Sequence, residues 1–203
     1  MKTGRILIFI LMVGCMATIK ADSFGPFTEN MYLSSKGGYA FVVRRENEKG
    51  GNELRGTLFK KDFEVPIGMS KFQYRALWHT KIEEENLPAA MYVADSGKWV
   101  VQTQLDSDAA NVAAVVVYGE QGEMRAKFKL NEIFSKVEIS KLPQTTSMTL
   151  WGGGHYFSGK EDKFVLRLWK DGDPEKGYRY QTKAIRLSDF AIVPYPLSSK
   201  KTK

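Results

Sequence analysis

The stretch Met91-Tyr-Val-Ala-Asp-Ser-Gly-Lys-Trp-Val-Val-Gln-Thr103 decides the fold class, because it places two strand-forming segments around a turn. In the turn, Asp95-Ser-Gly-Lys98, the aspartate can bond the backbone ahead of it and the glycine supplies a positive φ. Along the second segment Trp99, Val101 and Thr103 share one face, and we expect that face to point to the core. The stretch therefore predicts a β-hairpin.

Three further pairs of segments combine an apolar strand, a turn and a return strand that mixes apolar with basic residues. They are residues 39–45 with 54–60, residues 114–118 with 124–130, and residues 164–169 with 180–187. The residues between the strands of each pair include glycine, which favours chain reversal. Their spacing is irregular, so the chain has a loose repeat and not a periodic array.

One segment departs from the β pattern. Within residues 131–142, Ser135 and Glu138 have the spacing of a capping box, and Pro143 ends the segment. One or two short helices are therefore expected. The predicted fold is all-β: an antiparallel meander of hairpins in a propeller-like or sandwich arrangement, with a short helix near residues 131–142.

Three motifs between residues 91 and 151 carry a resemblance to known proteins. They are Val93-Ala-Asp-Ser-Gly-Lys-Trp-Val-Val101, Val115-Val-Val-Tyr118, and the stretch 130–143 followed by Ser147 and Trp151. In this part the chain resembles uncharacterised secreted bacterial proteins with β-propeller-like hairpin repeats. The resemblance implies a succession of antiparallel hairpins, and it brings no assigned activity with it.

Residues 1–21 have the layout of an export signal. A start with two basic residues precedes an unbroken apolar run over residues 6–13, and small residues follow it. Cleavage after Ala21 is expected, which releases a chain without cysteine. A second route also stays open, in which Met12-Val-Gly-Cys15 is a lipobox and Cys15 becomes the lipid anchor of a bacterial lipoprotein.

The remaining chain is expected to be one domain. The apolar run of the signal is too short for a permanent transmembrane helix, and no later segment comes closer. We expect a single β-rich domain over residues 22–195 and a disordered basic tail over residues 196–203. Removal of the signal lowers the net charge from +7 to +4, because the signal holds three basic residues and no acid. This mild excess and the export signal argue against nucleic-acid binding.

Few residues are suited to catalysis. The two histidines are His79 and His155, and neither lies in a recognised catalytic motif. No Gly-x-Ser-x-Gly elbow occurs, and Asp106-Ser-Asp108 with Asn111 lacks the central glycine and the distal glutamate of a calcium loop. We therefore expect no catalytic residue, no metal and no cofactor.

The candidate ligand site is the segment Trp151-Gly-Gly-Gly-His-Tyr-Phe157. Its three glycines permit a close approach of the backbone to a ligand, and Trp151, His155 and Tyr156 would then line a binding surface. The alternative is a bulged β-turn with the aromatic side chains packed beneath it. The sequence leaves both interpretations open.

Together these patterns predict an exported protein of a bacterial envelope, periplasmic or extracellular, or else a membrane-anchored lipoprotein. The expected function is a non-enzymatic binding or interaction module for a protein or a glycan. The alternative is a hydrolase acting on an envelope polymer or glycan, with His155 or a pair of carboxylates as its base. A histidine within hydrogen-bond reach of a carboxylate would favour the enzyme.

Overall fold

The computed structural model describes residues 29–48, 51–62, 73–82, 88, 90–104, 113–142, 151–173 and 177–196. The predicted export signal with Cys15, the polar loop at residues 106–108 and the tail beyond residue 196 lie outside these ranges. Within them, twelve strands form three antiparallel sheets of four strands each, and two short helices follow the second sheet. This part of the chain contains no helix of the length and apolar character that a membrane crossing requires.

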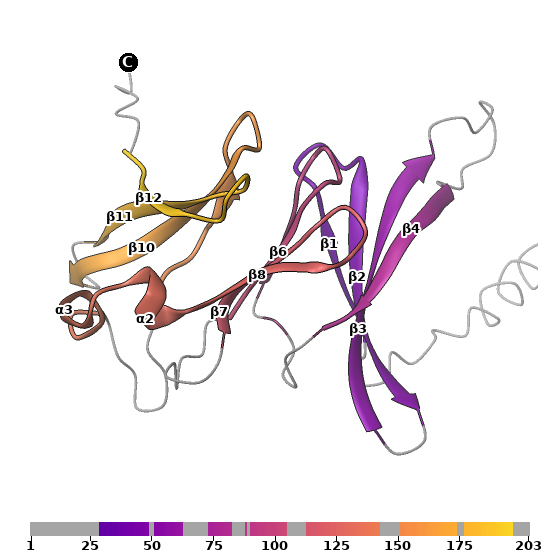
Figure 1. Cartoon of the computed structure of the whole chain (residues 1–203), viewed down its shortest axis with the longest axis horizontal. Helices are drawn as coiled ribbons and strands as arrows, with labels where there is room; N and C mark the ends of the chain where they lie inside the picture. Colours follow the sequence, from indigo (N-terminus) through magenta and orange to yellow (C-terminus); the bar gives the residue numbers. More distant parts are fainter. Residues whose placement is uncertain are drawn as a thin grey trace, which may run out of the picture.

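Each sheet is an up-and-down meander in which every strand pairs with the next along the chain (Figure 1). The first sheet contains β1 (Glu29–Leu33), β2 (Tyr39–Glu48), β3 (Gly51–Asp62) and β4 (Gln73–Lys81). The second contains β5 (Ala90–Val93), β6 (Val100–Thr103), β7 (Ala113–Tyr118) and β8 (Met124–Lys129). The third contains β9 (Tyr156–Phe157), β10 (Lys163–Asp173), β11 (Gly177–Arg186) and β12 (Ile192–Pro194).

The predicted all-β antiparallel meander is confirmed, as are its hairpins. β5 pairs with β6, β2 with β3, β7 with β8, and β10 with β11. Gly97 has a φ of +71°, the positive φ that was predicted for the turn between β5 and β6. Four-stranded meanders are the unit from which propellers are built, but the three sheets of the described residues form no closed ring.

The predicted helical segment consists of two short helices, α2 (Leu130–Ile133) and α3 (Lys136–Ile139). The capping box begins α3: the Ser135 hydroxyl accepts from the Glu138 N–H at 3.2 Å, and the Glu138 carboxylate accepts from the Ser135 N–H at 2.7 Å. Buried side chains of α2 pack into the core that the second and third sheets share. The helices therefore cover one part of that core.

The second sheet lies between the other two sheets (Figure 1). All six residues of β7 are buried, and from Val115 onward their side chains alternate between two cores. Val115 and Val117 pack in the core shared with the third sheet, and Val116 and Tyr118 pack in the core shared with the first sheet. The fold is thus a stack of three β-layers with two apolar interfaces.

This stacking changes one expectation about the strand at residues 99–104. Val101 points to a core, as predicted, but the opposite face is buried as well, because Val100 packs in the other core. All four residues of β6 are buried. The two inner strands of the middle layer, β6 and β7, have no face left for solvent, whereas β8 at the edge of the same sheet is largely exposed.

We expect Gly97→Val to lower the free energy of unfolding by roughly 1–3 kcal/mol, because a β-branched residue is strained at positive φ. A Cβ at this position would also lie 2.3 Å from Cε1 of Tyr39. The matched control is Gly38→Val, whose Cβ meets no heavy atom within 4 Å. Urea unfolding of both variants tests this, and equal stabilities would contradict it.

Candidate functional site

Each sheet begins with an edge strand followed by the same six-residue turn: turn 1 (residues 34–39), turn 2 (residues 94–99) and turn 3 (residues 158–163). In each turn the N–H of the first residue donates to the carbonyl of the sixth, at 2.9, 3.0 and 2.9 Å. The N–H of the fourth residue donates to the carbonyl of the first, at 2.9, 3.0 and 2.8 Å. The fourth residue has a positive φ in all three: Gly37 (+68°), Gly97 (+71°) and Glu161 (+53°).

Carboxylates join turn 1 to turn 2 and turn 2 to turn 3. Asp95 of turn 2 accepts hydrogen bonds from the backbone N–H of Lys36, at 2.8 Å, and from the hydroxyl of Ser35, at 2.5 Å. Glu161 of turn 3 accepts from the backbone N–H groups of Asp95, at 2.5 Å, and Ser96, at 3.1 Å. The three sheets are therefore connected at their turns as well as through their cores.

Glu161 occupies a position where the other two turns have glycine. A non-glycine residue at positive φ is strained, at a cost of about 1–3 kcal/mol. Glycine would remove the strain, but it has no carboxylate to bind turn 2. The two hydrogen bonds from turn 2 offset this strain and explain why glutamate stands here.

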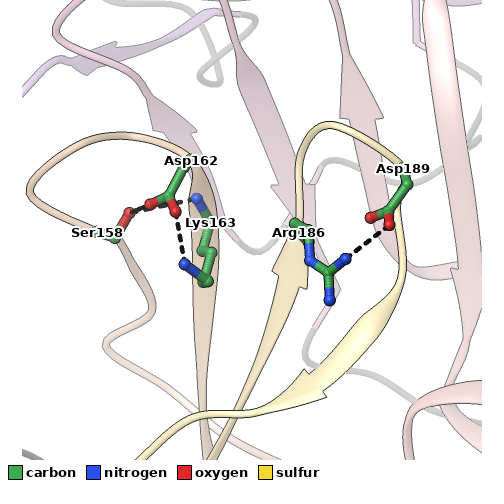
Figure 2. Close-up of polar contacts among 5 residues, drawn as sticks. All are labelled: Ser158, Asp162, Lys163, Arg186 and Asp189. Carbon is green, nitrogen blue, oxygen red and sulfur yellow. Dashed lines mark hydrogen bonds and ion pairs between the residues drawn. The ribbon is translucent and has the colours of Figure 1, made fainter.

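Turn 3 is also held from within (Figure 2). The Ser158 hydroxyl donates to Asp162 at 2.6 Å, and the Lys163 ammonium group lies 2.5 Å from the same carboxylate. The hydrogen bonds from Lys163 and Ser158 lower the pKa of Asp162 to about 2. Figure 2 also shows the pair Arg186–Asp189, at 2.9 Å, in the turn between β11 and β12.

A cavity of about 690 Å³ lies among the three turns and the edge strands β1, β5 and β9. Its walls combine apolar, hydroxyl and charged side chains: Leu33, Ser35, Lys36, Met91, Tyr92, Val93, Asp95, Ser96 and residues 155–161. Its volume falls in the range of small-molecule sites, about 300–1,000 Å³. The cavity exists because the three sheets bring equivalent edges and turns together.

His155 lines this cavity but belongs to the core by its contacts. It is 5% exposed, and its ring stacks on Trp151 with 5.0 Å between centroids. Its Nδ1 accepts a hydrogen bond from the Arg167 backbone N–H at 3.1 Å. Burial, and then the charge of Arg167, lower the pKa of His155 to about 4, so the ring is neutral at pH 7.

The structure separates the three residues predicted to bind a ligand. Trp151 is fully buried, and its Nε1 donates to the carbonyl of Gln104 at 2.6 Å. His155 is buried at the cavity wall, whereas Tyr156 is 41% exposed and lines the cavity. Only Tyr156 therefore offers a ligand a large accessible side chain, and the binding role of all three stays a prediction.

The fold itself uses part of the glycine run. Gly152 forms a β-bridge with Leu168, and a Cβ on Gly152 would lie 2.4 Å from the Arg167 carbonyl oxygen. The segment therefore runs along the edge of β10, and Gly152 permits that close approach. Gly153, by contrast, has open space around its Cβ position.

The described residues contain little acid–base chemistry. His79 is exposed on β4, and in the described ranges neither histidine is hydrogen-bonded to a carboxylate. Burial raises the pKa of Asp95, but its hydrogen bonds from Ser35 and Lys36 bring the pKa below its usual value. The same ranges hold no group of three His, Cys, Asp or Glu side chains placed to bind a metal ion.

Sequence reasoning did not single out Glu161 or the shared turn. The loose repeat that it found relates β2–β3, β7–β8 and β10–β11. The first and last of these are the middle pairs of their sheets, but β7–β8 is the final pair of its sheet. A search for a six-residue turn with glycine at its fourth position finds turns 1 and 2. Turn 3 escapes that search, because glutamate replaces the glycine.

We expect acidic pH to destabilise the protein through His155. Between its ordinary pKa of 6.5 and the lowered value of about 4, the unfolded chain binds more protons than the folded chain. The stability that neutral His155 contributes is therefore complete above pH 6.5 and is lost as pH falls toward 4, by about 3 kcal/mol. Unfolding free energies of the wild type and His155→Gln, measured across this range, test the prediction. An equal pH slope in both proteins would exclude His155 as the titrating group.

Glu161→Gln should cost about 1–2 kcal/mol of stability, because an amide nitrogen cannot accept one of the two hydrogen bonds from turn 2. The control is Glu120→Gln. Among the described residues Glu120 makes only an exposed ion pair with Lys98, at 3.6 Å, and its replacement should cost less than about 0.5 kcal/mol. Chemical denaturation of both variants measures the two losses of stability. Equal losses would show that the hydrogen bonds of Glu161 make no net contribution to the free energy of unfolding.

Comparisons with known proteins identified no relative of this chain. No protein-family model matches the chain, and no curated protein is similar to it in sequence. The functional interpretation therefore rests on the turns, the cavity and the exposure of Tyr156.

Proposed function

We propose that the protein is an exported, non-enzymatic binding module of a bacterial envelope and that it holds a glycan in the cavity at turns 1–3. The layout of residues 1–21 supports the export. The observation that carries the binding site is the exposed ring of Tyr156 on the wall of a cavity that also contains hydroxyl and ammonium groups. A protein ligand is the other class of partner that the sequence suggested.

Binding explains the cavity better than hydrolysis does. A glycosidase needs one carboxyl group as acid and another as base or nucleophile. At this cavity, Asp95 and Glu161 both accept hydrogen bonds from a neighbouring turn. His155 is neutral, and its Nδ1 is occupied by the Arg167 N–H. The groups that hydrolysis would require are therefore committed to the fold.

The cavity lining fits a sugar. A pyranose ring presents an apolar face that stacks on an aromatic ring, and hydroxyl groups that exchange hydrogen bonds at its edge. Tyr156 provides the aromatic ring, Leu33 an exposed apolar side chain, and Ser96 a hydroxyl group. A volume of about 690 Å³ accommodates a short oligosaccharide.

The test is to measure, by calorimetry, the binding of neutral and acidic oligosaccharides prepared from bacterial envelope polymers. Tyr156→Ala should weaken binding about tenfold or more, because the aromatic contact is lost. The matched control is Tyr74→Ala: Tyr74 is 40% exposed on β4 and does not line the cavity.

Two results would overturn this proposal. One is equal affinity in both variants, which would place the ligand elsewhere. The other is release of reducing ends by the wild-type protein, which would establish a hydrolase.

A further inference from the structure

The internal repeat shows what the three turns do with their outward N–H groups. In turn 2 the second and third residues, Asp95 and Ser96, donate both N–H groups to one carboxylate, that of Glu161. In turn 1 the third residue, Lys36, donates its N–H to the carboxylate of Asp95. The turn is therefore a carboxylate-binding unit, occupied in turns 1 and 2 by a side chain from the next sheet.

Turn 3 has the same backbone but no such occupant. Its second and third residues are Gly159 and Lys160, and in the described part of the chain their N–H groups donate to no acceptor. Both residues are exposed and line the cavity. No further sheet follows the third one among the described residues, so none supplies the carboxylate.

The open N–H groups of turn 3 lie beside the ammonium-bearing residue Lys160, while the two carboxylates at the cavity wall, Asp95 and Glu161, are hydrogen-bonded to neighbouring turns. Lys160 lines the cavity and forms no ion pair within the described ranges. Lys36 is also at the cavity, where burial raises the pKa of Asp95 and the charge of Lys36 helps to lower it. Turn 3 itself contains two carboxylates: Glu161 accepts the N–H groups of turn 2, and Asp162 forms an ion pair with Lys163 at 2.5 Å (Figure 2). Consecutive backbone N–H groups in such a turn form an anion-binding concavity.

We infer that turn 3 binds a carboxylate of the ligand, and that the ligand is an acidic oligosaccharide such as a hexuronate. The N–H groups of Gly159 and Lys160 each donate to one carboxylate oxygen, as the N–H groups of turn 2 do to Glu161. The ammonium group of Lys160 adds an ion pair. This inference rests on the proposed function, because it names the class of glycan that the same cavity takes.

A sugar acid suits this position better than a peptide. A peptide that adds to a sheet gains affinity from a row of backbone hydrogen bonds along an open edge. The edge strand that leads into turn 3, β9, has only two residues, Tyr156 and Phe157. A sugar instead uses the exposed ring of Tyr156 beside the two N–H groups.

The direct test is a titration of the ¹⁵N-labelled full chain with hexuronate oligosaccharides. The same oligosaccharides after reduction of each carboxylate to an alcohol are the control ligands. The amide signals of Gly159 and Lys160 should move downfield with the acid only. The amide signals of Asp95 and Ser96 should keep their chemical shifts, because these N–H groups already donate to Glu161.

Variants separate the two interactions. Gly159→Pro removes one N–H donor and should weaken hexuronate binding by about tenfold or more. Gly159→Ala keeps that donor and should bind as the wild type does, because the Cβ position is open. Lys160→Gln should weaken binding and its salt dependence, and Lys141→Gln, exposed on the surface away from the cavity, should change neither.

Each outcome has one meaning. Equal affinity for the acid and its reduced form, with Tyr156 still required, overturns the carboxylate site and leaves the proposed function in place. Binding of neither form, when a peptide that ends in a free carboxylate binds at Gly159 and Lys160, overturns the glycan as the ligand. No response of these two amides to any carboxylate overturns the site itself.

Discussion

The burial of both faces of β6 and β7, the inner strands of the second sheet, is the constraint on which the rest of this structure depends. β7 runs Ala-Ala-Val-Val-Val-Tyr, and none of its residues is exposed. A sheet built on such a strand is stable in water only if apolar layers cover it on both sides. The first and third sheets provide those layers, so the order of the three sheets follows from the hydrophobic effect.

The stacking has a consequence for the turns. Because the sheets are equivalent meanders, their first turns meet at one place, where the backbone N–H groups of one turn face the carboxylate of the next. These bonds occupy Asp95 and Glu161, which otherwise would be the acidic groups of the cavity. The same repetition creates the cavity and ties the two carboxylates at its wall to neighbouring turns. It leaves turn 3, the last in the series, with an unoccupied copy of the arrangement.

The glycine-rich segment shows how one sequence feature serves two purposes. Gly152 lets the backbone approach β10, which is a requirement of the fold. The residues after the glycines reach the cavity, where Tyr156 is exposed and His155 is buried in contact with Trp151. The sequence predicted these aromatic residues as a group, but neighbouring positions of an extended chain point in opposite directions. Their exposure therefore differs although they adjoin in sequence.

The sequence by itself determined the strands of four hairpins, the turn at Gly97 and the capping box of Ser135 and Glu138, because these features depend on residues close together in the chain. It did not determine that Val100 and Val101 pack in different cores, since alternation cannot reveal how many layers surround a strand. It also did not identify Glu161, whose partners lie 65 and 66 positions away in the chain. Burial and long-range hydrogen bonds arise only when the sheets stack, and so the tertiary structure alone decided which aromatic ring, carboxylate and turn remain open to a ligand.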